Sequence, residues 1–145
     1  MSNLKKINLQ YLFSYLGLFP IIFVVIDKYF FFKLKYEIYL DFTIYYSIVI
    51  FVFIGSTNWN LSTKIQNHII IFGLLPSLLS VFIIVLNLYN YNSVILIILL
   101  SFLFILQLIM DYIFNYNKKP KYKVFYKLRL PLAVLVSSLL IIIII

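Results

Sequence analysis

Five long apolar runs divide this chain, at 9–26, 42–59, 69–88, 94–114 and 128–145, and short polar or charged links separate them. A helix of about 20 apolar residues crosses the hydrocarbon core of a bilayer, where helices satisfy their own backbone hydrogen bonds. Of 145 residues, 65% are hydrophobic and 11% are charged, whereas about a quarter are charged in soluble domains. The sequence therefore predicts an all-α integral membrane bundle of five transmembrane helices, with residues 1–145 forming a single transmembrane domain.

The positions of the basic residues predict how the bundle is oriented. The N-terminus, the second link and the fourth link together hold nine of the twelve Lys and Arg residues. Because basic residues stay on the cytoplasmic side, we expect a cytoplasmic N-terminus and a C-terminus on the opposite side. The net charge of +8 is then a topology signal that also attracts anionic lipid headgroups, and not a nucleic-acid surface. The basic loop expected to contact those headgroups contains Lys118, Lys119, Lys121, Lys123 and Lys127.

Reactive side chains are scarce in this chain. It has no Cys, one His and four acidic residues, which excludes Cys-based metal centres and thiolate nucleophiles. The sequence also lacks a phosphate-binding glycine loop and an adjacent nucleophile and base. We therefore expect no enzymatic activity, no catalytic residue, no metal and no cofactor.

Small residues and prolines inside the apolar runs mark where helices pack closely. Small side chains let membrane helices approach one another, and proline breaks or kinks a helix. The expected packing positions are Gly17 and Pro20 in the first helix, Gly73, Pro76, Ser77 and Ser80 in the third, and Ala133 and Ser137 in the fifth.

Polar residues from three helices converge at one predicted end of the bundle. Asp111 is the only acid inside a predicted span, and Gln107 precedes it by one turn on the same face. Arg129, the only arginine, opens the last helix. An acid in hydrocarbon is costly and tends to be paired, which predicts an Asp111–Arg129 pair between helices. The end of the second helix, with Gly55, Asn58 and Trp59, is expected to cover that pair.

Three blocks of the sequence carry a family resemblance: residues 15–20, Tyr46-Ser47 with residues 53–59, and Asp111 with Tyr126, Leu128, Arg129 and Leu132. Through these blocks the chain resembles a family of small multi-pass membrane proteins that includes transmembrane protein 69 and occurs in bacteria and eukaryotic organelles. Ser56 stands where that family usually has a second glycine. The resemblance implies a membrane location but no activity, substrate or cofactor.

Two functions remain open from the sequence. The favoured one is a non-enzymatic structural or accessory protein of the bacterial cytoplasmic (inner) membrane. It would pack with itself, as a homo-oligomer, or with a larger membrane complex through the small-residue faces of the third and fifth helices. The alternative is a small oligomeric transporter or proton-linked carrier that uses the buried Asp111 and Arg129. Access of water to Asp111 distinguishes the two.

Overall fold

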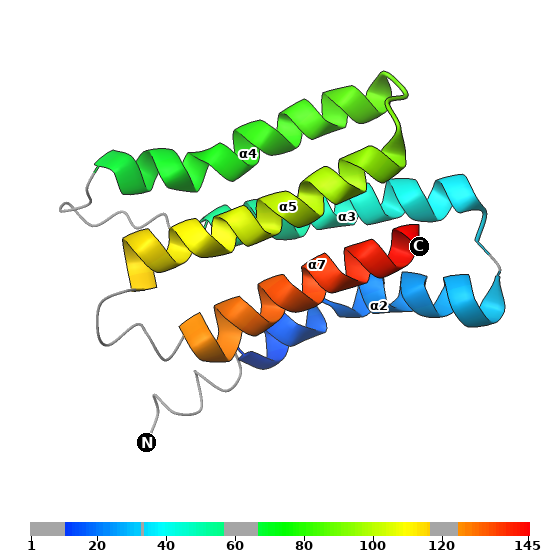
Figure 1. Cartoon of the computed structure of the whole chain (residues 1–145), viewed down its shortest axis with the longest axis horizontal. Helices are drawn as coiled ribbons and strands as arrows, with labels where there is room; N and C mark the ends of the chain where they lie inside the picture. Colours follow the sequence, from blue (N-terminus) through cyan, green and yellow to red (C-terminus); the bar gives the residue numbers. More distant parts are fainter. Residues whose placement is uncertain (1–10, 33, 57–66, 117–124) are drawn as a thin grey trace.

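A computed structural model describes residues 11–32, 34–56, 67–116 and 125–145, and within these ranges it is a bundle of helices (Figure 1). This confirms the predicted all-α class, and the helices suit an integral membrane protein. Within these described ranges, five helical segments are long and apolar enough to cross a membrane: Tyr11–Phe31, Tyr36–Ser56, Ile71–Leu88, Ser93–Phe114 and Phe125–Ile144.

The spans combine α-helices with short π-helical turns. Residues 11–16 are helical and are followed by α2 (Phe19–Ile26), the π-helical η1 (Asp27–Phe31), α3 (Tyr36–Ser56) and α4 (Asn67–Leu88). Next come α5 (Ser93–Asp111), η2 (Tyr112–Tyr116), η3 (Phe125–Arg129) and α7 (Leu130–Ile144). The start of α5 is fixed by Asn92, whose side-chain oxygen accepts hydrogen bonds from the backbone N–H of Val94 at 3.0 Å and of Ile95 at 3.4 Å.

Helix α5 occupies the middle of the bundle. It packs against α7 on one side and α3 on the other, while α4 covers α3 and α2 lies beside α7 (Figure 1). The Phe51 and Phe104 rings meet edge to face, with centroids 5.4 Å apart, and join α3 to α5. Ile21, Leu100 and Leu140 add fully buried side chains from α2, α5 and α7.

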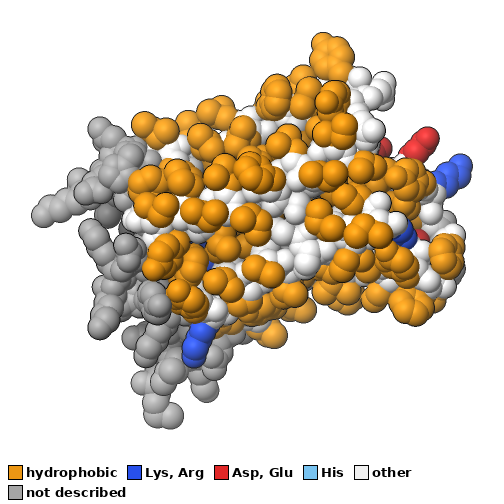
Figure 2. Space-filling view, viewed as in Figure 1, with side chains coloured by type: hydrophobic (Ala, Val, Ile, Leu, Met, Phe, Trp, Pro, Cys, Tyr) orange, Lys and Arg blue, Asp and Glu red, His pale blue; other side chains and the backbone are white. Residues whose placement is uncertain are grey.

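The outer surface of the bundle is apolar. Figure 2 shows hydrophobic side chains over most of the visible face and charged side chains toward its two ends. Large side chains such as Phe19, Phe53 and Leu78 are well exposed on this surface. In water such a surface would favour aggregation, whereas in a bilayer it contacts lipid.

The first link differs from its prediction. The sequence leaves residues 27–41 as a link between the first two apolar runs, but the first span continues through η1 to Phe31 and α3 already begins at Tyr36. Phe32 ends η1 in the left-handed conformation, with a φ of 51°. The buried Asp27 holds this turn, because its carboxylate accepts the backbone N–H of Leu34 at 2.9 Å. The hydrogen bonds that Asp27 accepts stabilise this turn, and a hydropathy pattern does not reveal such bonds.

The longer spans also correct the prediction of which acidic residues lie inside a membrane helix. Asp111 is not the only acid inside a span, since Asp27 lies in Tyr11–Phe31, and Glu37 and Asp41 lie in Tyr36–Ser56. The prediction ended the first span at 26 and began the second at 42 because charged residues lie between them. A helix can nevertheless continue through charged residues at the membrane boundary, since their long side chains reach water there.

Lys28 and Tyr29 cap the far end of α7. The Lys28 ammonium donates to the Ile143 carbonyl at 2.9 Å, and the Tyr29 hydroxyl donates to the Ile142 carbonyl at 3.0 Å. The last carbonyls of a helix lack intrahelical partners and carry partial negative charge, which a lysine neutralises. Lys28 therefore ties the end of the first span to α7.

The first span is interrupted just before Pro20. Pro20 lies in the first turn of α2, where a missing N–H costs nothing, and the preceding helix ends in a turn at Gly17 and Leu18. The Tyr46 hydroxyl of α3 donates to the Gly17 carbonyl at 2.8 Å. The neighbouring helix thus supplies a hydrogen bond where the helical ladder breaks, as the proline predicts.

Gly55 lets α4 approach α3 closely. A Cβ atom at Gly55 would lie 2.5 Å from Pro76 Cγ and 3.3 Å from the Gly73 carbonyl oxygen. Gly73, Pro76 and Ser80 are buried and Ser77 is half-buried. The predicted packing face of the third span is therefore used against α3, inside the chain.

The small residues of the last span are also used internally. Ala133 and Ser137 are buried, and Ser137 exchanges hydrogen bonds with Ser101 of α5. Each hydroxyl donates to the other residue's carbonyl at 3.3 Å. The expectation that these faces bind a partner is corrected here, because α5 and α3 already bury them.

We predict that Gly55→Ala destabilises the protein. The new methyl group would overlap the Pro76 ring, so that α3 and α4 must separate, at an expected cost of about 1–3 kcal/mol. The free energy of unfolding, followed by circular dichroism in mixed micelles, measures this cost. Gly17→Ala is the matched control, because a Cβ there meets only carbonyl oxygens of its own span, the nearer at 3.3 Å. Equal stability of the two variants would contradict the close α3–α4 contact.

Candidate functional site

A buried ion pair joins two spans near one end of the bundle. Asp111 is the last residue of α5, and Arg129 is the last residue of η3, directly before α7. Arg129 Nη1 lies 3.8 Å from Asp111 Oδ2, and the two side chains are 10% and 2% exposed. The interhelical pair predicted from the sequence is therefore present.

Gln107 and the end of α3 also contact the pair. Gln107 Nε2 donates to Asp111 Oδ1 at 3.4 Å, which places the predicted one-turn neighbour on the carboxylate. Arg129 Nη1 also donates to the Ile54 carbonyl at 3.5 Å. Ile54 lies in the last turn of α3, where carbonyls carry the negative end of the helix dipole. The guanidinium therefore connects three helices, α3, α5 and α7.

The space beside the pair is small. A cavity of about 30 Å³ lies there, and its walls are largely apolar. This volume suits one water molecule, whereas small-molecule sites need several hundred Å³. The lining residues are Ile54, Phe104, Gln107, Leu108, Asp111, Arg129, Leu132 and Ala133. The arrangement can hold a charge in place, but it offers no room for a substrate.

The end of α3 reaches the pair differently from the prediction. Gly55 faces Pro76 of α4, and its neighbour Ile54 contacts Arg129 instead. Consecutive residues of a helix point in different directions, so the glycine that admits α4 cannot also cover the ion pair. Asn58 and Trp59, the other residues expected to cover it, lie outside the described residues.

Most of the basic loop also lies outside the described residues. Lys118, Lys119, Lys121 and Lys123 fall there, and their contact with anionic headgroups stays a prediction. Lys127 is described and exposed, and its backbone carbonyl accepts the Tyr15 hydroxyl at 2.9 Å.

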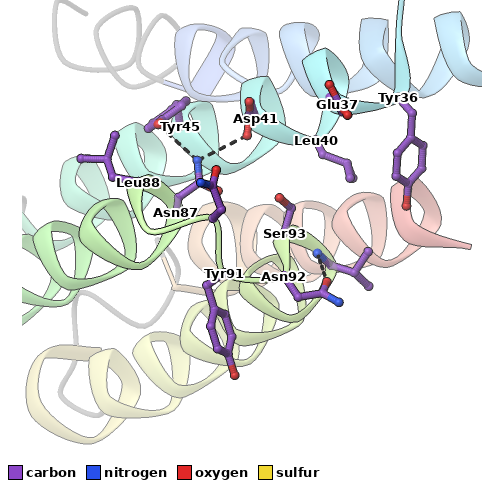
Figure 3. Close-up of a pocket in the computed structure, with 12 residues that line it drawn as sticks. Tyr36, Glu37, Leu40, Asp41, Tyr45, Asn87, Leu88, Tyr91, Asn92 and Ser93 are labelled. Atoms are coloured by element: carbon purple, nitrogen blue, oxygen red, sulfur yellow. Dashed lines mark hydrogen bonds between the residues drawn. The ribbon is translucent and has the colours of Figure 1, made fainter.

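A polar cleft that sequence reasoning missed lies at the opposite end of the bundle. It has a volume of about 740 Å³ and lies between the start of α3 and the turn from α4 to α5 (Figure 3). Asn87 Nδ2 donates to Asp41 Oδ1 at 3.3 Å and to the Tyr45 hydroxyl at 3.2 Å, which joins the two walls. The lining residues are Tyr36, Glu37, Leu40, Asp41, Tyr45, Asn87, Leu88, Asn90, Tyr91, Asn92, Ser93 and Val94.

The signal for the α3 wall of this cleft was present in the sequence. Glu37, Asp41 and Tyr45 are spaced four residues apart, which places them on one face once α3 is known to begin at Tyr36. The prediction of a link up to Asp41 concealed that spacing.

Comparisons of this chain with protein-family models, curated proteins and solved structures found no match. Among the described residues, no group of three or more His, Asp and Glu side chains could hold a metal ion.

We predict that Arg129→Met strongly destabilises the protein. The change would leave the Asp111 carboxylate buried without the guanidinium, and breaking a buried pair costs about 3–5 kcal/mol. Lys127→Met is the control, since it removes an exposed positive charge two residues earlier. Unfolding in mixed micelles measures both variants.

The double variant Asp111→Leu/Arg129→Met is expected to recover most of that loss. Replacing both charges by apolar side chains removes the desolvation cost together with the attraction. A double variant as unstable as Arg129→Met would contradict a mainly electrostatic coupling between the two residues.

Proposed function

We propose that this chain is a non-enzymatic structural or accessory protein of the bacterial cytoplasmic membrane. The observation that carries the proposal is the enclosure of Asp111. Its side chain is 2% exposed and lies beside Arg129, and the cavity that both residues line has a volume of only about 30 Å³. Charged residues inside membrane helices mark transport pathways when they face water-filled cavities. Here the charges tie helices together, which supports a clamp more than a carrier.

The proposed orientation follows the basic residues. Nine of the twelve Lys and Arg residues belong to the N-terminus, the second link and the fourth link, which supports a cytoplasmic location for that end of the bundle. The Asp111–Arg129 pair would then lie near the cytoplasmic boundary, and the polar cleft near the opposite one. Membership in the family that includes transmembrane protein 69 is part of the same proposal.

The proposed partners are the bilayer itself, anionic headgroups near the basic loop, and further copies or a larger membrane complex. Contacts with other proteins would use the outer apolar surface, since the small-residue faces of α4 and α7 are buried within the chain. The exposed side of α4, with Leu74, Leu78 and Phe82, offers such a surface.

Thiol labelling tests the proposal. The chain has no cysteine, so one introduced thiol gives an unambiguous signal. Ala133→Cys places a thiol at the small cavity beside Arg129. Tyr89→Cys places a thiol in the turn after α4, at a position where the native side chain is 82% exposed. With a charged, water-soluble thiol reagent in membranes, we expect Ala133→Cys to react at least about a hundredfold more slowly, because a buried thiol reacts only on local opening.

Labelling after unfolding in detergent is the control, and both variants should then react alike. Rapid labelling of Ala133→Cys in native membranes would reveal a water path to the ion pair. That result would overturn the structural proposal and favour the proton-linked carrier.

A further inference from the structure

The polar cleft lies where two spans end. Its α3 wall begins with Tyr36, the first residue of one candidate span, and its other wall includes Leu88, the last residue of another. Leu88 and Tyr91 line the cleft and are 68% and 48% exposed, so the cleft opens beside exposed apolar and aromatic side chains at the end of a span. Its volume of about 740 Å³ falls within the usual range for small-molecule sites.

The lining of the cleft is negatively charged. Glu37 and Asp41 contribute two carboxylates, and no basic residue is among the lining residues. Asp41 accepts a hydrogen bond from Asn87, while no ion pair or side-chain hydrogen bond of Glu37 occurs in the described part of the chain. Figure 3 shows these carboxylates on the α3 side, opposite the residues of the α4–α5 turn. Such a cleft repels anions and attracts cations.

We propose that this cleft binds an organic ammonium group, carried either by a lipid headgroup or by a free amine. The carboxylates supply charge-assisted hydrogen bonds to the ammonium, and Tyr36 and Tyr45, which also line the cleft, have aromatic rings of the kind that attracts cations. The cleft is far larger than a metal ion, and the described residues offer no metal-binding group of three or more ligands. Amide donors on Asn90 and Asn92 suit the phosphate that accompanies an ammonium in a zwitterionic headgroup.

Two probes distinguish the sources of the ammonium. Native mass spectrometry of the full chain, released from nanodiscs that contain equal phosphatidylethanolamine and phosphatidylglycerol, reports which lipid is retained. A thermal shift titration with ethanolamine hydrochloride in detergent, against sodium chloride at equal ionic strength, reports binding of a free amine. Retention of phosphatidylethanolamine assigns the cleft to a headgroup, whereas a shift with ethanolamine without lipid retention assigns it to a free amine.

Variants test the residues. Glu37→Gln changes an exposed side chain that has no hydrogen bond or ion pair among the described residues, so it should fold normally, and Glu37→Gln/Asp41→Asn removes both charges. We expect the double variant to weaken binding of whichever probe the wild type binds by at least about tenfold, since hydrogen bonds to charged groups are the strong ones. Tyr36→Leu should weaken binding by about threefold through loss of the ring.

Tyr89→Leu is the matched control for Tyr36→Leu. Both tyrosines are exposed at the same end of the bundle, but Tyr89 does not line the cleft, and its variant should bind as the wild type does. Unchanged binding in the double variant would overturn the proposal. Preferential retention of phosphatidylglycerol, or no binding of either probe by the wild type, would overturn it equally.

Discussion

Polar groups in hydrocarbon are costly unless they are paired, and hydrogen bonds and an ion pair between helices organise the bundle. Ser101 and Ser137 exchange hydroxyl-to-carbonyl hydrogen bonds between α5 and α7. Lys28 satisfies a terminal carbonyl of α7, and Arg129 links Asp111 of α5 to a carbonyl of α3. Each of these contacts joins two different helices, because a helix already satisfies its own interior backbone and leaves only side chains and end groups to pair. The polar contacts therefore specify which helices are neighbours, while lipid surrounds the apolar remainder.

Close approach of backbones is the second determinant. The hydrophobic effect does not favour one apolar contact over another inside a bilayer, so helix association depends on packing and hydrogen bonds. Gly55 provides the space that the Pro76 ring occupies, and this fit joins α4, the outermost helix, to α3. The same glycine could not also cover the Asp111–Arg129 pair, which contacts the preceding residue, Ile54. One turn of α3 thus has two different neighbours on two faces.

The two ends of the bundle differ in their access to water. At one end Asp111 and Arg129 are paired and enclosed, which suits a role in holding α3, α5 and α7 together. At the other end Glu37 and Asp41 line an open cleft of about 740 Å³ at the boundary of two spans. A buried pair has its charge neutralised by the protein, whereas exposed carboxylates keep their charge available for a ligand. The cleft is therefore the place where we propose that a ligand binds.

Hydropathy was enough to predict five membrane helices, and helical spacing with the cost of a buried charge was enough to predict that Asp111 meets Arg129. The boundaries near charged residues were wrong, because Asp27 closes a turn with its own hydrogen bonds and α3 extends to Tyr36. Single helices could not reveal that the small-residue faces pack inside the chain. Nor could they reveal the cleft, which Glu37 and Asp41 of α3 form together with Asn87 of α4. Such contacts depend on which helices become neighbours and in what register, and that is set by packing between segments distant in the sequence.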